Sequence, residues 1–349
     1  MSKFLAWPAT LEVLEQGRDL STDQAHWAMR EILENRADTE QIKSFLLALR
    51  LKGESAPELN AFIDEMFLHT SPISISERAV DVVGTGGDLA NTINISTTAA
   101  IVAAAAGARV VKHGSRAATS LCGSADLLEA LGVAISLTGP AIETTVRELG
   151  IGFCLAPIFH PAMRFAAPAR IELGVPTVFN ILGPLANPAK PHAIALGVAS
   201  EKMHLLMAQV LAERGVDGFV FRGDDGIDEI TLSTSTTLLT IGDGRVVKST
   251  IDPKDFGIAY APISELIGGD AQENARITTA VLAGERGAYR DAVVLNAAAA
   301  IAAFRGEQER TPIEGITDGI SAAIVAIDSG AATHLLARWV ALTQKLAAS

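Results

Sequence analysis

Residues 84–88 have the sequence GTGGD, which could bind an anion. Glycines let backbone N–H groups converge on an anion without interference from Cβ atoms. The segment follows a short apolar run at 79–83 and precedes a predicted helix that begins near Ser96, whose N-terminus would add N–H groups and the helix dipole. The hydroxyls of Ser96 and Thr97 could also bind a phosphate or a metal ion. The alternative is an ordinary strand-to-helix turn with Ser96 as the helix N-cap.

This glycine segment fits neither common nucleotide-binding motif. A GxGxxG motif would need a glycine where Leu89 stands, and a P-loop would need a lysine that does not follow here. A second segment, 112–126, can supply the missing charge. Lys112 follows a predicted strand, and open parallel sheets bind ligands at the ends of their strands.

The same second segment contains further candidates. His113 and Arg116 bring donors or positive charge towards the first loop, and Ser120, Gly123 and Ser124 form another small-residue turn before a predicted helix capped by Ser124. Two such turns at one sheet edge indicate a ligand with more than one phosphate. The alternative is that Arg116 is a surface cation and His113 a structural histidine.

An acidic turn at 223–229 could hold a divalent cation. Four carboxylates lie there, from Asp224, Asp225, Asp228 and Glu229. Mg²⁺ takes one or two carboxylates together with phosphate oxygens and water, and Asp228 with Glu229 fits that role. The alternative is a solvated loop.

The segment 156–188 carries His160 and Arg170, ten residues apart, in a helical and proline-rich context. A cation there could recognise a carboxylate. The alternative is that Arg164 and Arg170 are surface residues. No GxSxG, HExxH or Cys-His nucleophile pattern is present.

Composition narrows the class of protein. The chain has 349 residues, of which 49% are hydrophobic and 19% charged, as expected for a globular protein with an ample core. Its net charge of -12 opposes binding to nucleic acid or anionic membranes. The N-terminus lacks a signal-peptide layout, the apolar run at 97–111 is too short to span a bilayer, and the two cysteines, Cys122 and Cys154, show no metal spacing. We expect a cytoplasmic protein.

Periodicity predicts two kinds of structure. Residues 10–70 have the apolar spacing of four helices, at about 11–17, 21–35, 39–53 and 56–70. Short β-prone runs then alternate with helices, which predicts an α/β protein with a central, mostly parallel sheet flanked by helices. Expected strands include 133–136, and a Gly-Asp-Gly turn predicts a hairpin over 237–247. Two helices at 161–190 interrupt the alternation. We therefore expect a small all-helical domain of residues 1–72 plus about 161–190, and a larger α/β domain of 73–160 plus 191–349.

Taken together, the motifs closely resemble those of the anthranilate phosphoribosyltransferases of tryptophan biosynthesis. GTGGD, NIST, KHG.R, GSADLLEALG, HPAMR, FNILGPLANP, DGIDE and GGDAQENA occur in that family's order and spacing, over nearly the whole chain. The resemblance implies a homodimeric, Mg²⁺-dependent enzyme with its active site in a cleft between the two domains. Such an enzyme joins anthranilate to 5-phosphoribosyl-1-pyrophosphate and releases pyrophosphate, with two Mg²⁺ ions on the donor.

The resemblance also assigns roles to particular positions. It implies donor contacts from Gly84, Thr85, Gly86, Gly87, Asp88, Thr92, Asn94, Ser96, Thr97, Lys112 and Ser124. It implies metal binding by Ser96, Asp228 and Glu229, and anthranilate binding by Gly84, His113, Ser115, Pro157, His160 and Arg170, with Arg170 as the carboxylate partner. Two positions depart from the family: Ser115 replaces its usual asparagine, and Arg222 stands where it often has histidine. Asp88 could organise the loop, contact ribose hydroxyls or act through metal-bound water.

Two other functions are weighed against this one. A pyrimidine nucleoside phosphorylase would run related chemistry with phosphate as the nucleophile, but the HPAMR segment with Arg170 and the Asp228–Glu229 pair favour the transferase. A non-catalytic paralogue that binds nucleic acid should have a basic groove, which the net charge of -12 opposes.

Overall fold

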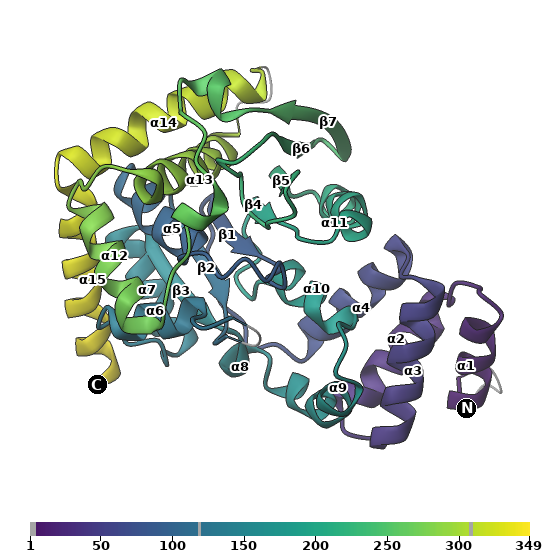
Figure 1. Ribbon diagram of the computed structural model, residues 1–349. Coiled ribbons are helices and arrows are strands. Elements are labelled where there is room, and N and C mark those ends of the chain that lie inside the picture. Colours follow the sequence, from purple (N-terminus) through teal and green to yellow (C-terminus); the bar gives the residue numbers. More distant parts are fainter. Residues whose placement is uncertain (1–4, 118–119, 307–309) are drawn as a thin grey trace. The chain divides into compact units, whose positions relative to one another are not determined.

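The computed structural model describes residues 5–117, 120–306 and 310–349, which divide into two compact units (Figure 1). Unit 1 contains residues up to Pro72 and Ala156–Pro188, and unit 2 contains Ile73–Leu155 and Ala189–Ser349. The inserted segment of unit 1 is Ala156–Pro188, compared with the expected range of about 161–190.

Unit 1 is all-helical. Its elements are α1 (Trp7–Glu15), α2 (Thr22–Leu33), α3 (Thr39–Lys52), α4 (Ala56–Leu68), α8 (Ala156–Phe159), the 3-10 helix η1 (Pro161–Ala166), α9 (Ala167–Leu173) and α10 (Val178–Leu185). Ser21 and Asp38 accept hydrogen bonds from the N–H groups of Gln24 and Gln41, which cap α2 and α3. Helices α2 and α4 pack on each other, and α3 packs on α9, so the inserted segment joins the N-terminal bundle.

Unit 2 contains a seven-stranded sheet with the order β3-β2-β1-β4-β5-β6-β7. The strands are β1 (Val80–Gly84), β2 (Val110–Gly114), β3 (Ile151–Leu155), β4 (Ala193–Gly197), β5 (Asp217–Gly223), β6 (Thr236–Gly242) and β7 (Arg245–Ile251). The first five in spatial order are parallel, and β6 and β7 form the expected antiparallel hairpin. The predicted fold class is confirmed.

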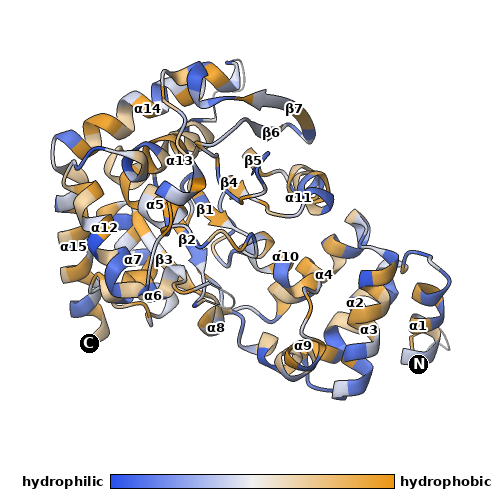
Figure 2. Cartoon of the chain, in the orientation of Figure 1, coloured by the Kyte–Doolittle hydropathy of each residue, from blue (hydrophilic) through white to orange (hydrophobic). Residues whose placement is uncertain are grey.

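Helices surround this sheet. They are α5 (Ile95–Ala105), α6 (Ser124–Ala130), α7 (Gly139–Leu149), α11 (Glu201–Glu213), α12 (Ala271–Leu282), α13 (Ala288–Arg305), α14 (Pro312–Asp328) and α15 (Ala331–Ala347), with short 3-10 helices η2 (Pro253–Phe256) and η3 (Ile263–Glu265). Helices α5 and α13 pack on β1, whereas α7 packs on β3 and α11 on β5. Figure 2 shows apolar residues along β1 and β4, the strands at the centre of the sheet.

Small residues allow α13 and α14 to pack closely in unit 2. A Cβ at Gly319 of α14 would overlap the backbone of Ala298 on α13, so the two helices approach to a distance that only glycine permits there. The abundance of alanine and glycine in the sequence predicts such close packing.

Three local predictions are wrong. Residues 133–136 are not a strand, because the N–H of Val133 bonds the end of α6 at Leu128 and that of Ala134 bonds the Thr343 hydroxyl on α15. Helix α5 begins at Ile95 with Asn94 as its N-cap, so Ser96 is not the cap. Ser124 is likewise the first residue of α6 and not its cap, which is Gly123.

Among the described residues, no single helix is long and apolar enough to cross a membrane. Helices α14 and α15 are bent by 69° relative to each other, and only the two together have the length and apolar composition of a membrane-spanning segment.

Candidate active site

The glycine loop at 84–88 leaves the carboxyl end of β1 beside β4, where the direction of strand order reverses. The N–H of Thr85 donates to the Gly197 carbonyl at 3.0 Å, which fixes the start of the loop on β4. Gly86 and Gly87 have φ values of 66° and 81°, which glycine adopts without strain. The loop is therefore anchored at its base and turns through left-handed conformations at Gly86 and Gly87.

The predicted metal pair lies directly against this loop. Asp228 Oδ2 accepts the N–H of Gly86 at 2.7 Å, and Glu229 Oε1 accepts the N–H of Ser96 in the first turn of α5 at 3.2 Å. Asp228 and Glu229 are 9% and 8% exposed, so both carboxylates are buried. The acidic turn and the glycine loop, about 140 residues apart in sequence, thus form one site.

Burial makes this pair of acids costly to ionise. Burial, followed by the charge of Asp88, raises the pKa of Asp228 to about 7. Burial and the charge of Asp228 raise the pKa of Glu229 well above its ordinary value. A divalent cation bound together with a phosphate ligand would offset this repulsion, and carboxylate and phosphate oxygens are the ligands that Mg²⁺ prefers. Within the described ranges, no group of three or more His, Cys, Asp or Glu side chains could hold a metal ion by itself, so the ligand would complete the coordination.

The other two acids of the turn have a structural role. Asp224 accepts hydrogen bonds from the hydroxyls of Ser235 at 2.5 Å and Thr237 at 2.9 Å. Asp225 accepts one from the hydroxyl of Thr231 at 2.5 Å and is also bonded by Ser233. The solvated-loop interpretation is therefore wrong for the buried pair, of which Asp228 bonds the glycine loop and Glu229 bonds the N-terminus of α5.

Lys112 brings the positive charge that the glycine loop lacks. It lies in the middle of β2 and not after the strand, as the sequence had indicated. Its side chain is 3% exposed and donates from Nζ to the carbonyl of Val82 on β1. Burial lowers the pKa of Lys112, while the nearby charges of Asp81, Glu229 and Asp228 oppose this shift. Lys112 therefore lies within electrostatic reach of the acidic pair.

The N-terminus of α5 contributes the remaining predicted donor residues from that region. Asn94 is the N-cap, and the Thr97 hydroxyl, in a residue only 1% exposed, has no hydrogen-bond partner among the described residues. Thr92 forms an isolated bridge with Ile267, which holds the chain between the glycine loop and α5. An orphaned buried hydroxyl at a helix N-terminus fits a site that receives a phosphate or metal ligand.

The second small-residue turn is shaped around Ser124. Its hydroxyl donates to the carbonyl of Ser115 at 3.2 Å, and a Cβ at Gly114 would overlap it. Arg116 bonds Asp126 at 2.9 Å and Glu129 at 2.8 Å, so its charge is taken up by α6. The surface-cation interpretation of Arg116 is therefore the better one.

Asp88 and His113 each make a contact that the sequence left open. Asp88 accepts the N–H of Ala90 at 3.1 Å, so it organises the loop, and its charge contributes to the raised pKa of Asp228. The N–H of His113 donates to the buried carboxylate of Asp81 at 3.1 Å. Sequence reasoning missed Asp81, although a carboxylate within the apolar run AVDVV was a usable signal.

Three predicted anthranilate residues lie in unit 1. Pro157 is in α8, and Arg170 of α9 stacks its guanidinium 5.6 Å from the centre of the Phe179 ring. His160 is 4% exposed, and its ring nitrogens contact the Thr70 hydroxyl at 3.0 Å and the Ala186 carbonyl at 2.7 Å. Burial lowers the pKa of both His160 and Arg170. For His160, this shift favours the neutral imidazole.

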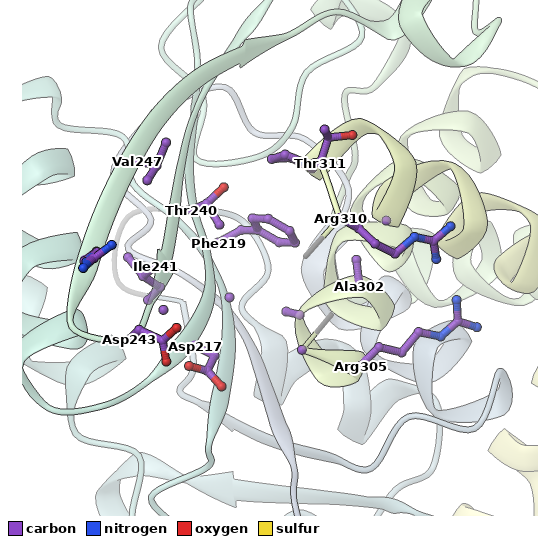
Figure 3. A pocket seen from close by; sticks show the side chains of 17 residues that line it. Asp217, Phe219, Thr240, Ile241, Asp243, Val247, Ala302, Arg305, Arg310 and Thr311 are labelled. Carbon is purple, nitrogen blue, oxygen red and sulfur yellow. The ribbon is translucent and has the colours of Figure 1, made fainter. Parts of the chain in front are cut away.

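A separate cavity of about 270 Å³ lies at the other end of the sheet, where β5 begins. Figure 3 shows Phe219 and Ile241 facing Ala302 across it, with the guanidinium groups of Arg305 and Arg310 directed away from Phe219. None of the predicted site residues line it.

Comparisons with known proteins agree with this geometry. Residues 9–69 match the helical bundle domain of a glycosyl transferase family, and residues 76–333 match the a/b domain of the same family. The fold and the site therefore define a glycosyl transferase built from a helical unit and an α/β unit.

Individual relatives narrow the class. An anthranilate phosphoribosyltransferase of Rhodococcus jostii is 53% identical over 343 residues, which is 98% of this chain and 95% of that protein. The crystal structure of the Thermus thermophilus anthranilate phosphoribosyltransferase has a TM-score of 0.88 at 39% identity, covering 96% of this chain and 99% of that one. The Saccharomyces cerevisiae enzyme, solved with PRPP and Mg, has a TM-score of 0.85 at 28% identity, covering 98% and 99%. The chain belongs to the anthranilate phosphoribosyltransferase family, which confirms the resemblance of the motifs.

Proposed function

We propose that this chain is a Mg²⁺-dependent enzyme that transfers the 5-phosphoribosyl group from 5-phosphoribosyl-1-pyrophosphate to the amine of anthranilate, in tryptophan biosynthesis. The observation that carries the proposal is the buried pair Asp228 and Glu229, hydrogen-bonded to the glycine loop and to the N-terminus of α5 beside Lys112. This arrangement, in a chain 53% identical to a named relative, suits a multiply charged donor.

The donor end of the reaction is electrostatic. The bond from the ribose carbon to pyrophosphate breaks and a carbon–nitrogen bond forms, after which the amine nitrogen releases a proton. Bound Mg²⁺ would be held by Asp228, Glu229 and the Ser96 hydroxyl, and would neutralise charge on the departing pyrophosphate. The ammonium of Lys112 would stabilise the same charge, together with the N–H groups of the glycine loop other than those of Thr85 and Gly86, which bond Gly197 and Asp228. Thr85, Asp88, Thr92, Asn94, Thr97 and Ser124 complete the proposed donor contacts.

The acceptor end requires positioning more than activation. An aromatic amine is neutral at pH 7, so a correctly placed amine needs no strong base to attack an electron-poor ribose carbon. We assign its carboxylate to Arg170, and its surroundings to Gly84, His113, Ser115, Pro157 and His160. Both ring nitrogens of His160 are bonded within unit 1. We therefore assign to the imidazole ring a packing contact with anthranilate and not a hydrogen bond.

The proposal includes a cytoplasmic homodimer. Large apolar side chains are exposed on two helices of unit 1 that pack together, with Leu51 of α3 at 78% and Ile171 of α9 at 79% exposure. Such a surface is stabilised when a second copy covers it. The two cysteines, both buried and unpaired, suit a reducing compartment. Light scattering at micromolar concentration tests the dimer, and a monomeric mass would overturn it.

A fluorescence assay tests the activity. Anthranilate fluorescence should fall when the donor is added with Mg²⁺, should persist in the presence of a chelator, and the product mass should correspond to the phosphoribosyl adduct. Turnover of thymidine or uridine with phosphate, without turnover of anthranilate, would instead favour the phosphorylase. Tight, salt-dependent DNA binding without any turnover would favour the non-catalytic paralogue.

A further inference from the structure

The motif GGDAQENA at 268–275 has no role in the proposed function. It comprises a short loop and the first turn of α12, where Asp270 is the N-cap and accepts the N–H of Glu273 at 2.9 Å. Asn274 lies in that turn and is only 2% exposed. A buried amide must be hydrogen-bonded, so its partners indicate what the motif does.

Asn274 is the middle of a one-directional chain of hydrogen bonds. The N–H of Gly269 donates to Asn274 Oδ1 at 2.8 Å, and Asn274 Nδ2 donates to Asn94 Oδ1 at 2.9 Å. Asn94 Nδ2 then donates to the Cys122 carbonyl at 3.0 Å. A backbone N–H can only donate and a backbone carbonyl can only accept, so the two ends fix the orientation of both amides.

The backbone around this series of hydrogen bonds restricts the position of the Asn274 side chain. A Cβ at Gly268 would lie 2.5 Å from Asn274 Oδ1, so the glycine gives the amide its space. The N–H of Ile93 donates to Leu266 and that of Gly268 donates to Asn91, each at 2.9 Å. The loop of the motif and the segment before α5 are therefore held side by side, with Asn274 joining them to the turn that contains Cys122.

We propose that Asn274 is a positioning residue for the phosphoribosyl donor and that it acts through Asn94. This inference rests on the proposed function, in which Asn94 contacts the donor. Asn274 holds the Asn94 side chain in one orientation before the donor arrives, so the entropy of fixing Asn94 is not lost on binding. An interaction that supports binding in the ground and transition states alike changes the KM for the donor more than kcat.

Asn274→Ala tests the role and Thr278→Val is its matched control. Thr278 is also buried on α12 and also contacts α5, through the Thr98 hydroxyl at 3.1 Å. Thr98 bonds only the backbone carbonyl of Asn94, so Thr278 does not orient the Asn94 side chain. We expect Asn274→Ala to raise the KM for the donor about tenfold, the effect of one lost buried hydrogen bond. The KM for anthranilate and kcat should stay within about twofold, and Thr278→Val should leave all three unchanged within the same limit.

A double-mutant cycle separates positioning from general destabilisation. On an Asn94→Ala background, Asn274→Ala should change the KM for the donor less than about twofold, because its route of action is already lost. A second full tenfold effect there would overturn the inference, as would equal effects of Asn274→Ala and Thr278→Val.

Asn274→Asp provides a second variant of the same shape. It keeps an acceptor for the N–H of Gly269 but opposes an oxygen to Asn94 Oδ1, so donor affinity should fall at least as far as in Asn274→Ala. Calorimetric titration of the donor with Mg²⁺ gives this affinity without turnover. If the wild-type chain binds the donor but shows no transfer to anthranilate, the proposed function fails. If it is active and both variants bind the donor normally, only this inference fails.

Discussion

At the scale of the residue, neighbouring acids of one turn have opposite roles because their surroundings differ. Asp224 and Asp225 accept hydrogen bonds from hydroxyl groups of the residues that follow the turn. Asp228 and Glu229 are instead buried, where they accept N–H groups of the glycine loop and of α5. The first two stabilise the folded turn. The second two destabilise it when ionised, since burial raises their pKa values. Such a cost is retained where charge is needed to bind a cation.

Asp228→Asn should therefore impair metal use without unfolding the protein. The amide oxygen can still accept the N–H of Gly86, but the charge is lost. We expect the Mg²⁺ concentration for half-maximal activity to rise at least about tenfold, as a charge-assisted contact contributes about 1.5–3 kcal/mol. The melting temperature without Mg²⁺ should not fall. Asp224→Ala is the control: it should lower the melting temperature and leave the Mg²⁺ dependence unchanged, and the reverse pattern would contradict the assignment.

At the scale of the element, β1 and β4 end in glycines because the acidic turn occupies the space that side chains would fill. A Cβ at Gly84, the end of β1, would overlap the Asp228 carboxylate, and one at Gly197, the end of β4, would overlap the Asp228 backbone. The carboxyl ends of these two neighbouring strands therefore admit the acidic turn only as glycines.

Gly84→Ala and Gly197→Ala should differ in a way that reports this geometry. At position 84 the Asp228 side chain can rotate away, so activity should fall more than about tenfold while the free energy of unfolding falls by about 1 kcal/mol. At position 197 the backbone itself must move, and we expect a loss of about 1–3 kcal/mol as well as activity. Chemical denaturation with parallel assays measures both. If the two variants lost the same free energy of unfolding, the distinction between a side-chain clash at position 84 and a backbone clash at position 197 would be wrong.

A second prediction at this scale concerns the contact between α2 and α4. Glu65 of α4 is 1% exposed and bonds Arg30 of α2 twice at 2.9 Å, with His26 at 3.3 Å. Burial acts to raise the pKa of Glu65, but Arg30 and the histidines outweigh it and the net shift is downwards. The stabilisation is thus fully present above the unfolded pKa of about 4.3 and is lost as the pH falls through the lowered folded value.

Glu65→Gln should therefore cost stability at neutral pH and little in acid. We expect a deficit of about 1–3 kcal/mol at pH 7, below the value for a fully buried pair because Arg30 is 44% exposed on its side chain. Unfolding measured from pH 7 to pH 3 should show the gap between variant and wild type closing below about pH 4. A gap that stays constant with pH would indicate lost packing in place of lost charge.

Element prediction succeeded where the signal is local and failed where it is not. Apolar spacing located the four N-terminal helices, and the alternation of runs located β1, β2 and β3. Residues 133–136 have the composition of a strand, but their N–H groups bond helices that no local pattern reveals. Ser96 has the right type for a cap, yet its N–H is taken by Glu229, over 130 residues away.

At the scale of the whole molecule, the sequence predicted the separate motifs of the site but not the contacts between them. The sequence located the glycine loop, Lys112 and the acidic pair separately, and the fold brings them together at one end of the sheet. Asp81 and Asn274 were missed because their importance depends on single distant partners. Asn274 lies 180 residues from Asn94, and no spacing rule connects an amide with another across that distance.

The donor and the carboxylate of anthranilate should depend on residues of different units. All proposed donor contacts lie in unit 2, whereas the proposed carboxylate partner of anthranilate, Arg170, lies in unit 1. Arg170→Ala should raise the KM for anthranilate by about 10–100-fold, the contribution of a bidentate charge-assisted contact, and leave calorimetric donor affinity unchanged. Lys112→Met should instead weaken the affinity for the donor and leave the KM for anthranilate unchanged.

Arg170→Lys sharpens this test, because it keeps the charge but loses the planar fork. Its KM for anthranilate should lie between those of the wild type and Arg170→Ala. If Arg170 only packs on Phe179, Lys and Ala should behave alike, and benzoate-type acids without an amine should compete equally well with wild type and variants. Steady-state kinetics with each substrate varied in turn measures the division. Equal losses for both substrates in Arg170→Ala and Lys112→Met would mean that the units do not bind them separately.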